Sequence, residues 1–161
     1  MPKSISLCMI TKNEEKYLEQ CLNSVKSIVD EIIIVDTGST DKTKEIAKKF
    51  NANIFDFKWI DDFSAARNES IKHATKEWVL VLDADEVIEK KDLSKIKNTI
   101  ENPEDFVGFQ LEQRSYLNNF FEGAVKNNSD FELIENYPFY ISHHLVRLFK
   151  NKLGLYFKHR I

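Results

Sequence analysis

The sequence is poor in the residues that bend, break or cross-link a chain. Its 161 residues include only four glycines, three prolines and two cysteines. Cys8 and Cys21 follow no pairing or metal-binding pattern, which argues against a disulfide framework and a zinc site, so we expect buried thiols in a reducing compartment. No linker rich in glycine, proline or serine and no internal repeat divides the chain. We therefore expect a single domain.

Long apolar runs and an excess of basic residues are also absent. No apolar run approaches the roughly 18 residues that a transmembrane helix needs, so we expect no membrane span. The formal net charge is −3, whereas a nucleic-acid-binding domain would show a concentrated basic face, so no nucleic-acid partner is expected. The N-terminus passes directly into a strand pattern, which predicts no signal peptide. We expect a cytoplasmic location, with the inner face of the membrane as one alternative.

Apolar residues predict strands and helices that alternate along the first hundred residues. Short apolar runs predict strands at residues 5–10, 32–35, 53–57 and 78–82. Between them, apolar residues at helical spacing predict helices around residues 18–28, 43–50 and 63–74. Strand–helix alternation of this kind predicts an α/β fold with a mostly parallel sheet flanked by helices and right-handed crossovers.

The pattern weakens in the remaining part of the chain. A further helix is expected around residues 93–100, and strands are expected at 106–111 and 144–149. Residues 112–140 are predicted to be irregular, with a mobile flap over the site as one interpretation. Residues 155–161 look like a returning strand. The chain then stops in mid-pattern, as expected of a piece excised from something longer.

The most informative stretch is the apolar run 78–82 with the acids that follow it. Such a run is typical of a strand buried on both faces of a parallel sheet. Asp83 and Asp85 follow directly, with Glu86 close behind, and carboxylates this close repel one another unless a cation lies between them. We therefore expect Mn²⁺ or Mg²⁺, hard cations that prefer oxygen ligands, to bind Asp83 and Asp85. The alternative is that both are solvated turn residues.

Polar segments follow three of the predicted strands, at residues 11–15, 36–41 and 83–86. In an open parallel sheet, ligands bind at the carboxyl ends of the strands, where these segments would meet. The first turn contains no glycine and no P-loop is present, so a glycine-rich phosphate cradle is not expected. A metal-bridged diphosphate is expected instead. Asp36 can accept hydrogen bonds from a base or ribose, or, alternatively, bond to its own backbone in a turn.

Four segments together resemble the family 2 glycosyltransferases, which are nucleotide-sugar-dependent enzymes of the GT-A fold. They are residues 6–15, 34–41, 62–68 and 81–85, and they occur in the family's order and spacing. The combination of Asn-Glu-Glu, Asp-Phe-Ser-Ala-Ala-Arg-Asn and Asp-Ala-Asp-Glu is similar to the subgroup that includes lipopolysaccharide-core and peptide glycosyltransferases. The resemblance implies a Rossmann-like GT-A fold, a nucleotide-diphosphate sugar donor such as a UDP-sugar, and transfer with inversion. It also implies a carbohydrate, lipid-linked or peptide acceptor.

The resemblance also implies roles for individual residues. Those expected to bind the nucleotide sugar are Thr11, Asn13, Glu14, Asp36, Arg67, Asp83 and Ala84. Asp83 and Asp85 would form the metal-binding Asp-x-Asp motif, with Asp85 the more direct ligand. The residues alone leave alternatives open: Glu14 can be a first-turn helix acid, and Arg67 can be a surface cation that pairs with a neighbouring acid. Trp59 can stack on a ligand.

Two departures from the family pattern bear on function. Thr37 occupies a position where the family commonly has a second acid. The family's catalytic base usually follows the Asp-x-Asp motif, in this subgroup as a His-Glu pair after a stretch like residues 157–161, so we expect the base beyond Ile161. Residues 1–111 would then form the nucleotide-sugar-binding half, and residues 112–161 an incomplete acceptor-side half. The piece alone would bind a nucleotide sugar but turn over poorly or not at all.

Two other classes of function stay open at this point. A nucleotidyltransferase also uses a doubly wound sheet with paired acids around a metal, although it usually opens with a glycine-rich basic loop that is absent here. A catalytically idle nucleotide-binding or interaction module could be built on the same fold.

Overall fold

The computed structural model describes residues 3–129 and 131–158 of the chain. The chain divides into two compact units. The first unit comprises Met1–Gly108 with Arg147–Ile161, and the second comprises Phe109–Val146. Residues 147–158 therefore belong with the N-terminal part of the chain.

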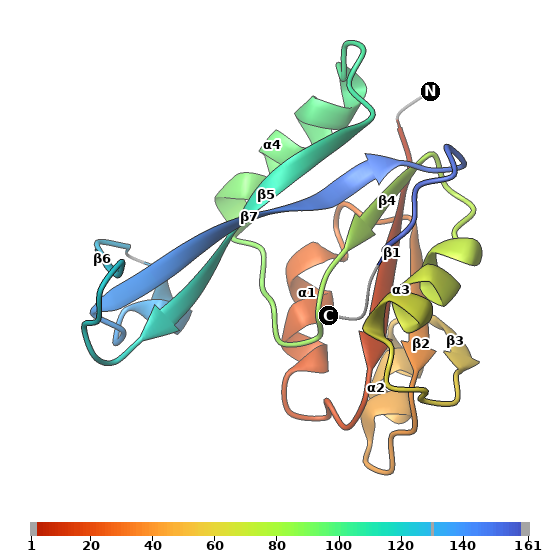
Figure 1. The fold of residues 1–161 in the computed structure, drawn as a ribbon, viewed down its shortest axis with the longest axis horizontal. Coiled ribbons are helices and arrows are strands. Elements are labelled where there is room, and N and C mark those ends of the chain that lie inside the picture. The colour runs from red at the N-terminus through yellow and green to blue at the C-terminus, as the bar shows by residue number, and fades with distance from the viewer. Residues whose placement is uncertain (1–2, 130, 159–161) are drawn as a thin grey trace. The chain divides into compact units, whose positions relative to one another are not determined.

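The first unit is built on a parallel sheet with helices between its strands (Figure 1). Its strands are β1 (Ile5–Thr11), β2 (Glu31–Asp36), β3 (Asn53–Asp56) and β4 (Trp78–Val81), in the spatial order β3-β2-β1-β4. Its helices are α1 (Leu18–Val25), α2 (Thr43–Lys49), α3 (Phe63–Lys72) and α4 (Lys90–Glu101). These four strands are parallel, and residues 148–150 pair antiparallel with β4. The predicted α/β fold with a mostly parallel sheet is thus confirmed.

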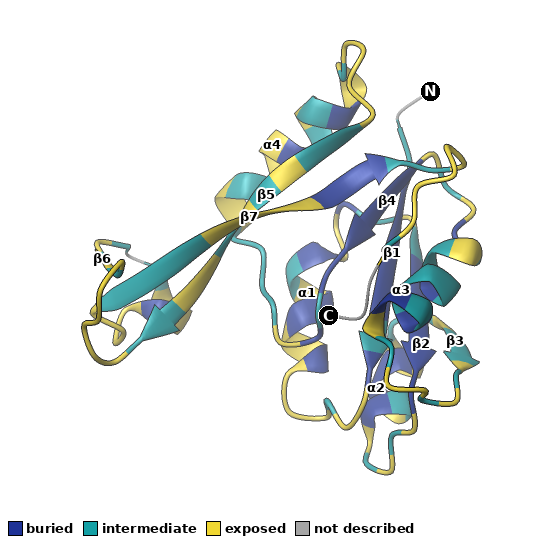
Figure 2. Cartoon of the chain, viewed as in Figure 1, coloured by how far each residue is buried: buried dark blue, intermediate teal, exposed yellow. Residues whose placement is uncertain are grey.

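The core of the first unit follows from the apolar runs of the sequence. All four residues of β4 are buried, as are nearly all residues of β1 and β2 (Figure 2). A strand with helices over both of its faces has no polar side, which explains why these runs are continuous instead of alternating. In α1, Leu18, Cys21, Leu22 and Val25 are buried at helical spacing. α3 lies against β1 and β2, and Asp62, the residue just before it, caps it by accepting a hydrogen bond from Ala65 N.

The second unit contains two long strands and little buried surface. β5 (Gly108–Leu117) lies beside β7 (Phe139–Lys150), and the short β6 (Val125–Lys126) pairs antiparallel with β7. A single 3₁₀ turn, η1 (Glu132–Ile134), supplies Ile134, the one buried apolar residue of this unit among those the structure describes.

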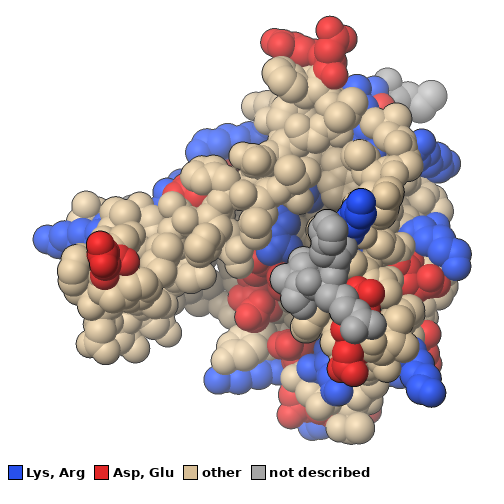
Figure 3. All heavy atoms as spheres, in the orientation of Figure 1, with Lys and Arg blue, Asp and Glu red and all other residues tan. Residues whose placement is uncertain are grey.

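Acidic and basic side chains are interspersed over the face of the molecule drawn in Figure 3.

Two predictions about the later part of the chain were wrong. Residues 112–140 are not irregular throughout, because β5 continues to Leu117 and β7 begins at Phe139. Strands were predicted at 106–111 and 144–149, but their extension into this region was missed because their exposed faces carry polar residues, such as Glu112 and Arg114, that mask the apolar signal. Conversely, residues 155–158 form no strand, and 159–161 lie outside the described residues. In the parts of the chain described here, no helix has the length and apolar character needed to cross a bilayer.

Candidate functional site

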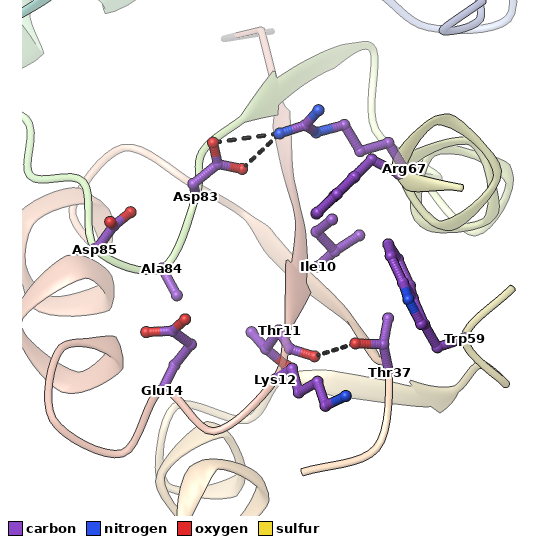
Figure 4. A pocket seen from close by; sticks show the side chains of 11 residues that line it. Ile10, Thr11, Lys12, Glu14, Thr37, Trp59, Arg67, Asp83, Ala84 and Asp85 are labelled. Atoms are coloured by element: carbon purple, nitrogen blue, oxygen red, sulfur yellow. Dashed lines mark hydrogen bonds and ion pairs between the residues drawn. The ribbon is translucent and has the colours of Figure 1, made fainter. Parts of the chain in front are cut away.

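A pocket of about 490 Å³ opens in the first unit, at the carboxyl ends of its strands (Figure 4). It is lined by Ile10, Thr11, Lys12, Glu14, Thr37, Trp59, Phe63, Arg67, Asp83, Ala84 and Asp85. The segments that follow β1, β2 and β4 all contribute, as the sequence predicted. Five of the seven residues expected to bind a nucleotide sugar therefore line one pocket, and so do both expected metal ligands.

Asp83 is held by two arginines from distant parts of the chain. Arg67 Nη2, on α3, lies 3.1 Å from Asp83 Oδ1 and 3.3 Å from Oδ2. Arg147 Nη2, on β7, lies 3.3 Å from Asp83 Oδ2 and 2.8 Å from Glu86 Oε1. Glu86 also accepts a hydrogen bond from Asp83 N at 2.8 Å. The turn after β4 is thus fixed by an ion-pair network in which cations already balance the Asp83 carboxylate.

Asp85 differs from Asp83, because its side chain is exposed at the pocket. Within the described part of the chain, its carboxylate has no hydrogen bond and no ion pair. Figure 4 shows Glu14 on the same side of the pocket as Asp85 and Ala84. Burial raises the pKa of Glu14, and the negative charges of Asp85, Asp41 and Asp83 raise it further. This side of the pocket therefore carries uncompensated negative charge.

The carboxylates of Asp83 and Asp85 are the expected ligands of a divalent cation at the pocket. No cluster of three histidine, cysteine, aspartate or glutamate side chains placed to bind a metal exists among the described residues. A preformed cage is not required, since Mg²⁺ usually binds through one or two carboxylates while substrate phosphates and water complete its shell. Asp85 suits this arrangement because its oxygens are free. Asp83 suits it less directly, because its oxygens already contact Arg67 and Arg147.

Asp36 is not among the residues that line the pocket. Its buried carboxylate accepts hydrogen bonds from Gly38 N at 3.1 Å and Ser39 N at 2.9 Å, and Thr11 Oγ1 lies 3.3 Å away. Burial by itself would raise the pKa of Asp36, but the bonds from Ser39 and Gly38 and the nearby Lys44 outweigh it and lower that pKa. The Asp36 side chain therefore bonds to the main chain of its own turn, and its contact with a nucleotide stays a prediction. Thr37, the next residue, lines the pocket instead and donates to Thr11 O at 3.1 Å.

Asn13 also lies outside the pocket lining. Its φ of 58° places it in the left-handed region, which asparagine tolerates better than most residues. Its side-chain oxygen accepts a hydrogen bond from Thr40 N at 2.8 Å, and its own N donates to Ser39 Oγ at 2.9 Å. Asn13 therefore ties the turn after β1 to the loop after β2, and its contact with a nucleotide stays a prediction.

An aromatic pair, Trp59 and Phe63, forms a wall of the pocket, and Figure 4 shows Trp59 on the side away from Asp85. The rings of Trp59 and Phe63 meet edge to face, with centroids 4.8 Å apart at an interplanar angle of 71°. Trp59 Nε1 donates to Asp61 Oδ1 at 2.9 Å, which fixes the indole, and Phe63 is 44% exposed. The wall thus offers an ordered aromatic surface to a flat ligand group.

Four residues at the site, Ile10, Lys12, Phe63 and Arg147, had not been singled out individually from the sequence. Lys12 lines the pocket beside Thr11, and its position in the first turn was the available signal. Arg147 is only 8% exposed. The sequence signal for its burial was a single cation among the apolar residues at the end of the predicted strand 144–149. A buried arginine needs acidic partners, but the sequence did not indicate that these would be Asp83 and Glu86.

Comparisons with known proteins agree with this geometry. Residues 6–154 match the family described as "Glycosyl transferase family 2". A TPR repeat-containing protein of Synechococcus elongatus is 47% identical over 100 residues, which cover 62% of this chain and 25% of that protein. The SPbeta prophage-derived glycosyltransferase SunS of Bacillus subtilis is 44% identical over 95 residues, which cover 58% of this chain and 22% of that protein. The chain thus matches only about a quarter of the length of these relatives.

A solved structure supports the fold. Staphylococcus aureus TarS 1–349, in complex with UDP-GlcNAc, matches with a TM-score of 0.54 and 30% identity over 62% of this chain and 31% of that chain. The α/β sheet flanked by helices therefore has the GT-A architecture that the sequence predicted. The chain belongs to glycosyl transferase family 2.

Proposed function

We propose that the pocket binds a nucleotide-diphosphate sugar, and that the chain is the donor-binding part of an enzyme that transfers this sugar with inversion. The observation that carries the proposal is one pocket bounded by Asp83–Ala84–Asp85 on one side and the Trp59–Phe63 wall on the other. The similarity to TarS, whose structure contains UDP-GlcNAc, supports a UDP-sugar as the donor class. The acceptor, which we propose to be a carbohydrate, a lipid-linked sugar or a peptide, rests on the resemblance of the motifs.

The two sides of the pocket suit the two ends of such a donor. The aromatic wall suits the base, because a base can stack on an exposed ring. Arg67 lines the same pocket, contacts Asp83 and suits the diphosphate, since a guanidinium binds phosphate oxygens through several N–H groups. Thr11 and Thr37 line the pocket with polar groups that can bond to the ribose.

The acidic side suits a divalent cation, Mn²⁺ or Mg²⁺, with Asp85 as the direct protein ligand and Asp83 as the second. When bound there, the ion would offset the charge that develops on the departing diphosphate. Arg147 and Arg67 would hold Asp83 in place from the other side. No histidine is present among the residues that line the pocket, and the catalytic base stays a prediction.

Calorimetry of the chain with UDP-GlcNAc, GDP-mannose and CDP-glucose, each with and without Mn²⁺, tests this function. We expect Mn²⁺-dependent binding of the UDP-sugar, weakened at least about tenfold in Asp85→Ala because a charge-assisted interaction is lost. Asp92→Ala is the matched control, since Asp92 lies in the first turn of α4, outside the pocket lining. Stronger binding of UTP than of any UDP-sugar would favour a nucleotidyltransferase, and a folded chain that binds no nucleotide would overturn the proposal.

A further inference from the structure

Asn68 of α3 holds the main chain of Phe157, 89 residues further on. Asn68 Nδ2 donates to Phe157 O at 2.9 Å, and Phe157 N donates to Asn68 Oδ1 at 2.7 Å. A single side-chain amide thus satisfies both main-chain groups of one residue, as a neighbouring strand would. Residues 155–158 form no strand, so Asn68 supplies the partner that this segment lacks.

The ring of Phe157 lies between the core and Arg67. It packs against the buried cluster that includes Cys8, Val79 and Phe149. The guanidinium carbon of Arg67 lies 5.5 Å from the centre of the same ring, within the range of a cation–π contact. Placing the main chain of Phe157 therefore also places the surface on which the Arg67 guanidinium rests.

Arg67 depends on this support because few groups orient it. Its Nη2 contacts Asp83, but its Nε is buried and has no hydrogen-bond partner among the described residues. In the part of the chain that the structure describes, the guanidinium pairs with Asp83 and lies over the Phe157 ring. A guanidinium that is bonded at only one nitrogen can still rotate about that contact. The Phe157 ring therefore limits the directions in which the other N–H groups of Arg67 point.

We propose that Asn68 is a positioning residue of the donor pocket, which acts through Phe157 to hold the Arg67 guanidinium between Asp83 and the donor diphosphate. The inference rests on the proposed function, because it takes Arg67 to bind the diphosphate. Consecutive residues of a helix point about 100° apart, so α3 can present Arg67 to the pocket and Asn68 to the Phe157 segment. Asparagine suits this position because its amide both donates and accepts. Aspartate has the same shape but would place a carboxylate oxygen against Phe157 O.

The first experiment needs no donor. The exchange of the Arg67 Nε proton with water is measured by NMR, with the signal assigned by its absence in Arg67→Lys. In Asn68→Ala, Asn68→Asp and Phe157→Leu we expect exchange to be faster by about fivefold or more, because the guanidinium loses its support. Asn151→Ala is the matched control, since the Asn151 side chain also bonds to main chain outside the pocket: its Nδ2 donates to Ala74 O at 2.9 Å and Lys76 O at 2.8 Å, and its Oδ1 accepts from Lys152 N at 2.8 Å. Equal exchange rates in Asn68→Ala and Asn151→Ala would overturn the proposal.

The second experiment is a double-mutant cycle read with UDP-GlcNAc and Mn²⁺. We expect Asn68→Ala to weaken binding about five- to tenfold, and to weaken it no further when Arg67 is already Met, because Asn68 acts through Arg67. If Asn68→Ala weakened UDP-GlcNAc binding equally in the Arg67→Met background, Asn68 would act independently of Arg67, and the proposal would be overturned. If Asn68→Ala fails to fold, Phe157→Leu carries the same cycle, since leucine keeps an apolar side chain in the cluster. If the unaltered chain binds no nucleotide sugar, the proposed function fails, and the exchange experiment still decides the role of Asn68.

Discussion

Arg147 Nη2 lies 2.8 Å from Glu86 Oε1, and the side chains of these two residues are only 9% and 15% exposed. The same nitrogen reaches Asp83 Oδ2 at 3.3 Å, so one buried cation joins the acids on either side of Ala84 and Asp85. Burial raises the pKa of Glu86, and the positive charge of Arg147 opposes this effect. The turn that presents Asp85 to the pocket therefore depends on a residue 64 positions further along the chain.

Replacing Arg147 tests this dependence. We expect Arg147→Met to lower the free energy of unfolding by about 3 kcal/mol, because it leaves Glu86 without its cation in a buried place. Urea unfolding followed by circular dichroism measures the change. Arg114→Met is the control, since Arg114 pairs with Glu112 at 2.7 Å on the surface, where such a pair contributes at most about 1 kcal/mol. Equal, small losses in both variants would contradict a stabilising role for Arg147.

Trp59 gives a second prediction, on the aromatic wall. We expect Trp59→Leu to weaken UDP binding about tenfold, because stacking of a base on an aromatic ring contributes about 1–3 kcal/mol. Ile60→Ala is the control, since Ile60 is the adjacent residue, is 52% exposed and does not line the pocket. Tryptophan fluorescence provides the measurement. Trp78 is fully buried in β4, so a UDP-dependent change should arise from Trp59 and vanish in Trp59→Leu. A change that survives this substitution would place the base elsewhere.

The parts of the fold that the sequence predicted are those whose signal is local. The continuous apolar runs of β1, β2 and β4 report burial on both faces, and Asp83 and Asp85 stand out because they follow such a run directly. The length of β5 and β7 was missed because a strand with one polar face and few buried partners carries a weak signal.

The sequence failed to predict two kinds of feature at the site. One is a contact between residues far apart in the chain, and the other is which of two adjacent residues lines the pocket. Arg147 reaches Asp83 from another strand, and no sequence spacing links the two. Asp36 and Thr37 are adjacent at the end of β2, where successive side chains point to opposite sides, so the choice of which one faces the pocket is decided by one position. In the structure, Thr37 lines the pocket and Asp36 does not.

The two thiols give a third prediction. Cys8 and Cys21 are both fully buried, and burial raises the pKa of each to about 12. The thiolate is the reactive form of cysteine, so neither thiol should react with Ellman's reagent at pH 8 while the chain is folded. Both should react within minutes in concentrated urea. The single-cysteine variants Cys8→Ala and Cys21→Ala identify the responsible residue if any signal develops in the native state, and fast native labelling of either thiol would contradict its burial.

The turn after β2 gives a fourth prediction, on pH. Hydrogen bonds from Ser39 and Gly38 and the charge of Lys44 lower the pKa of Asp36 below its ordinary value of 3.8, against the effect of burial. A carboxyl group whose pKa is lower in the folded state stabilises the fold above its ordinary pKa, and this contribution is lost as the pH falls through the folded-state pKa. The unaltered chain should therefore lose part of its free energy of unfolding below about pH 5 through Asp36.

Asp36→Asn removes this titration while keeping the shape of the side chain. We expect a loss of about 1–2 kcal/mol at pH 7, since a hydrogen-bonded charge is replaced by a neutral amide. We also expect the difference from the unaltered chain to shrink as the pH falls below 3.8, because the Asp36 carboxyl then takes up a proton more readily in the unfolded chain than in the folded one. Asp56→Asn is the control: Asp56 also pairs with Lys44, but its side chain is 79% exposed, so the pH dependence should stay unchanged. Urea unfolding at pH 7, 5, 4 and 3 measures both variants, and a difference that stays constant over this range would show that Asp36 acts through shape alone.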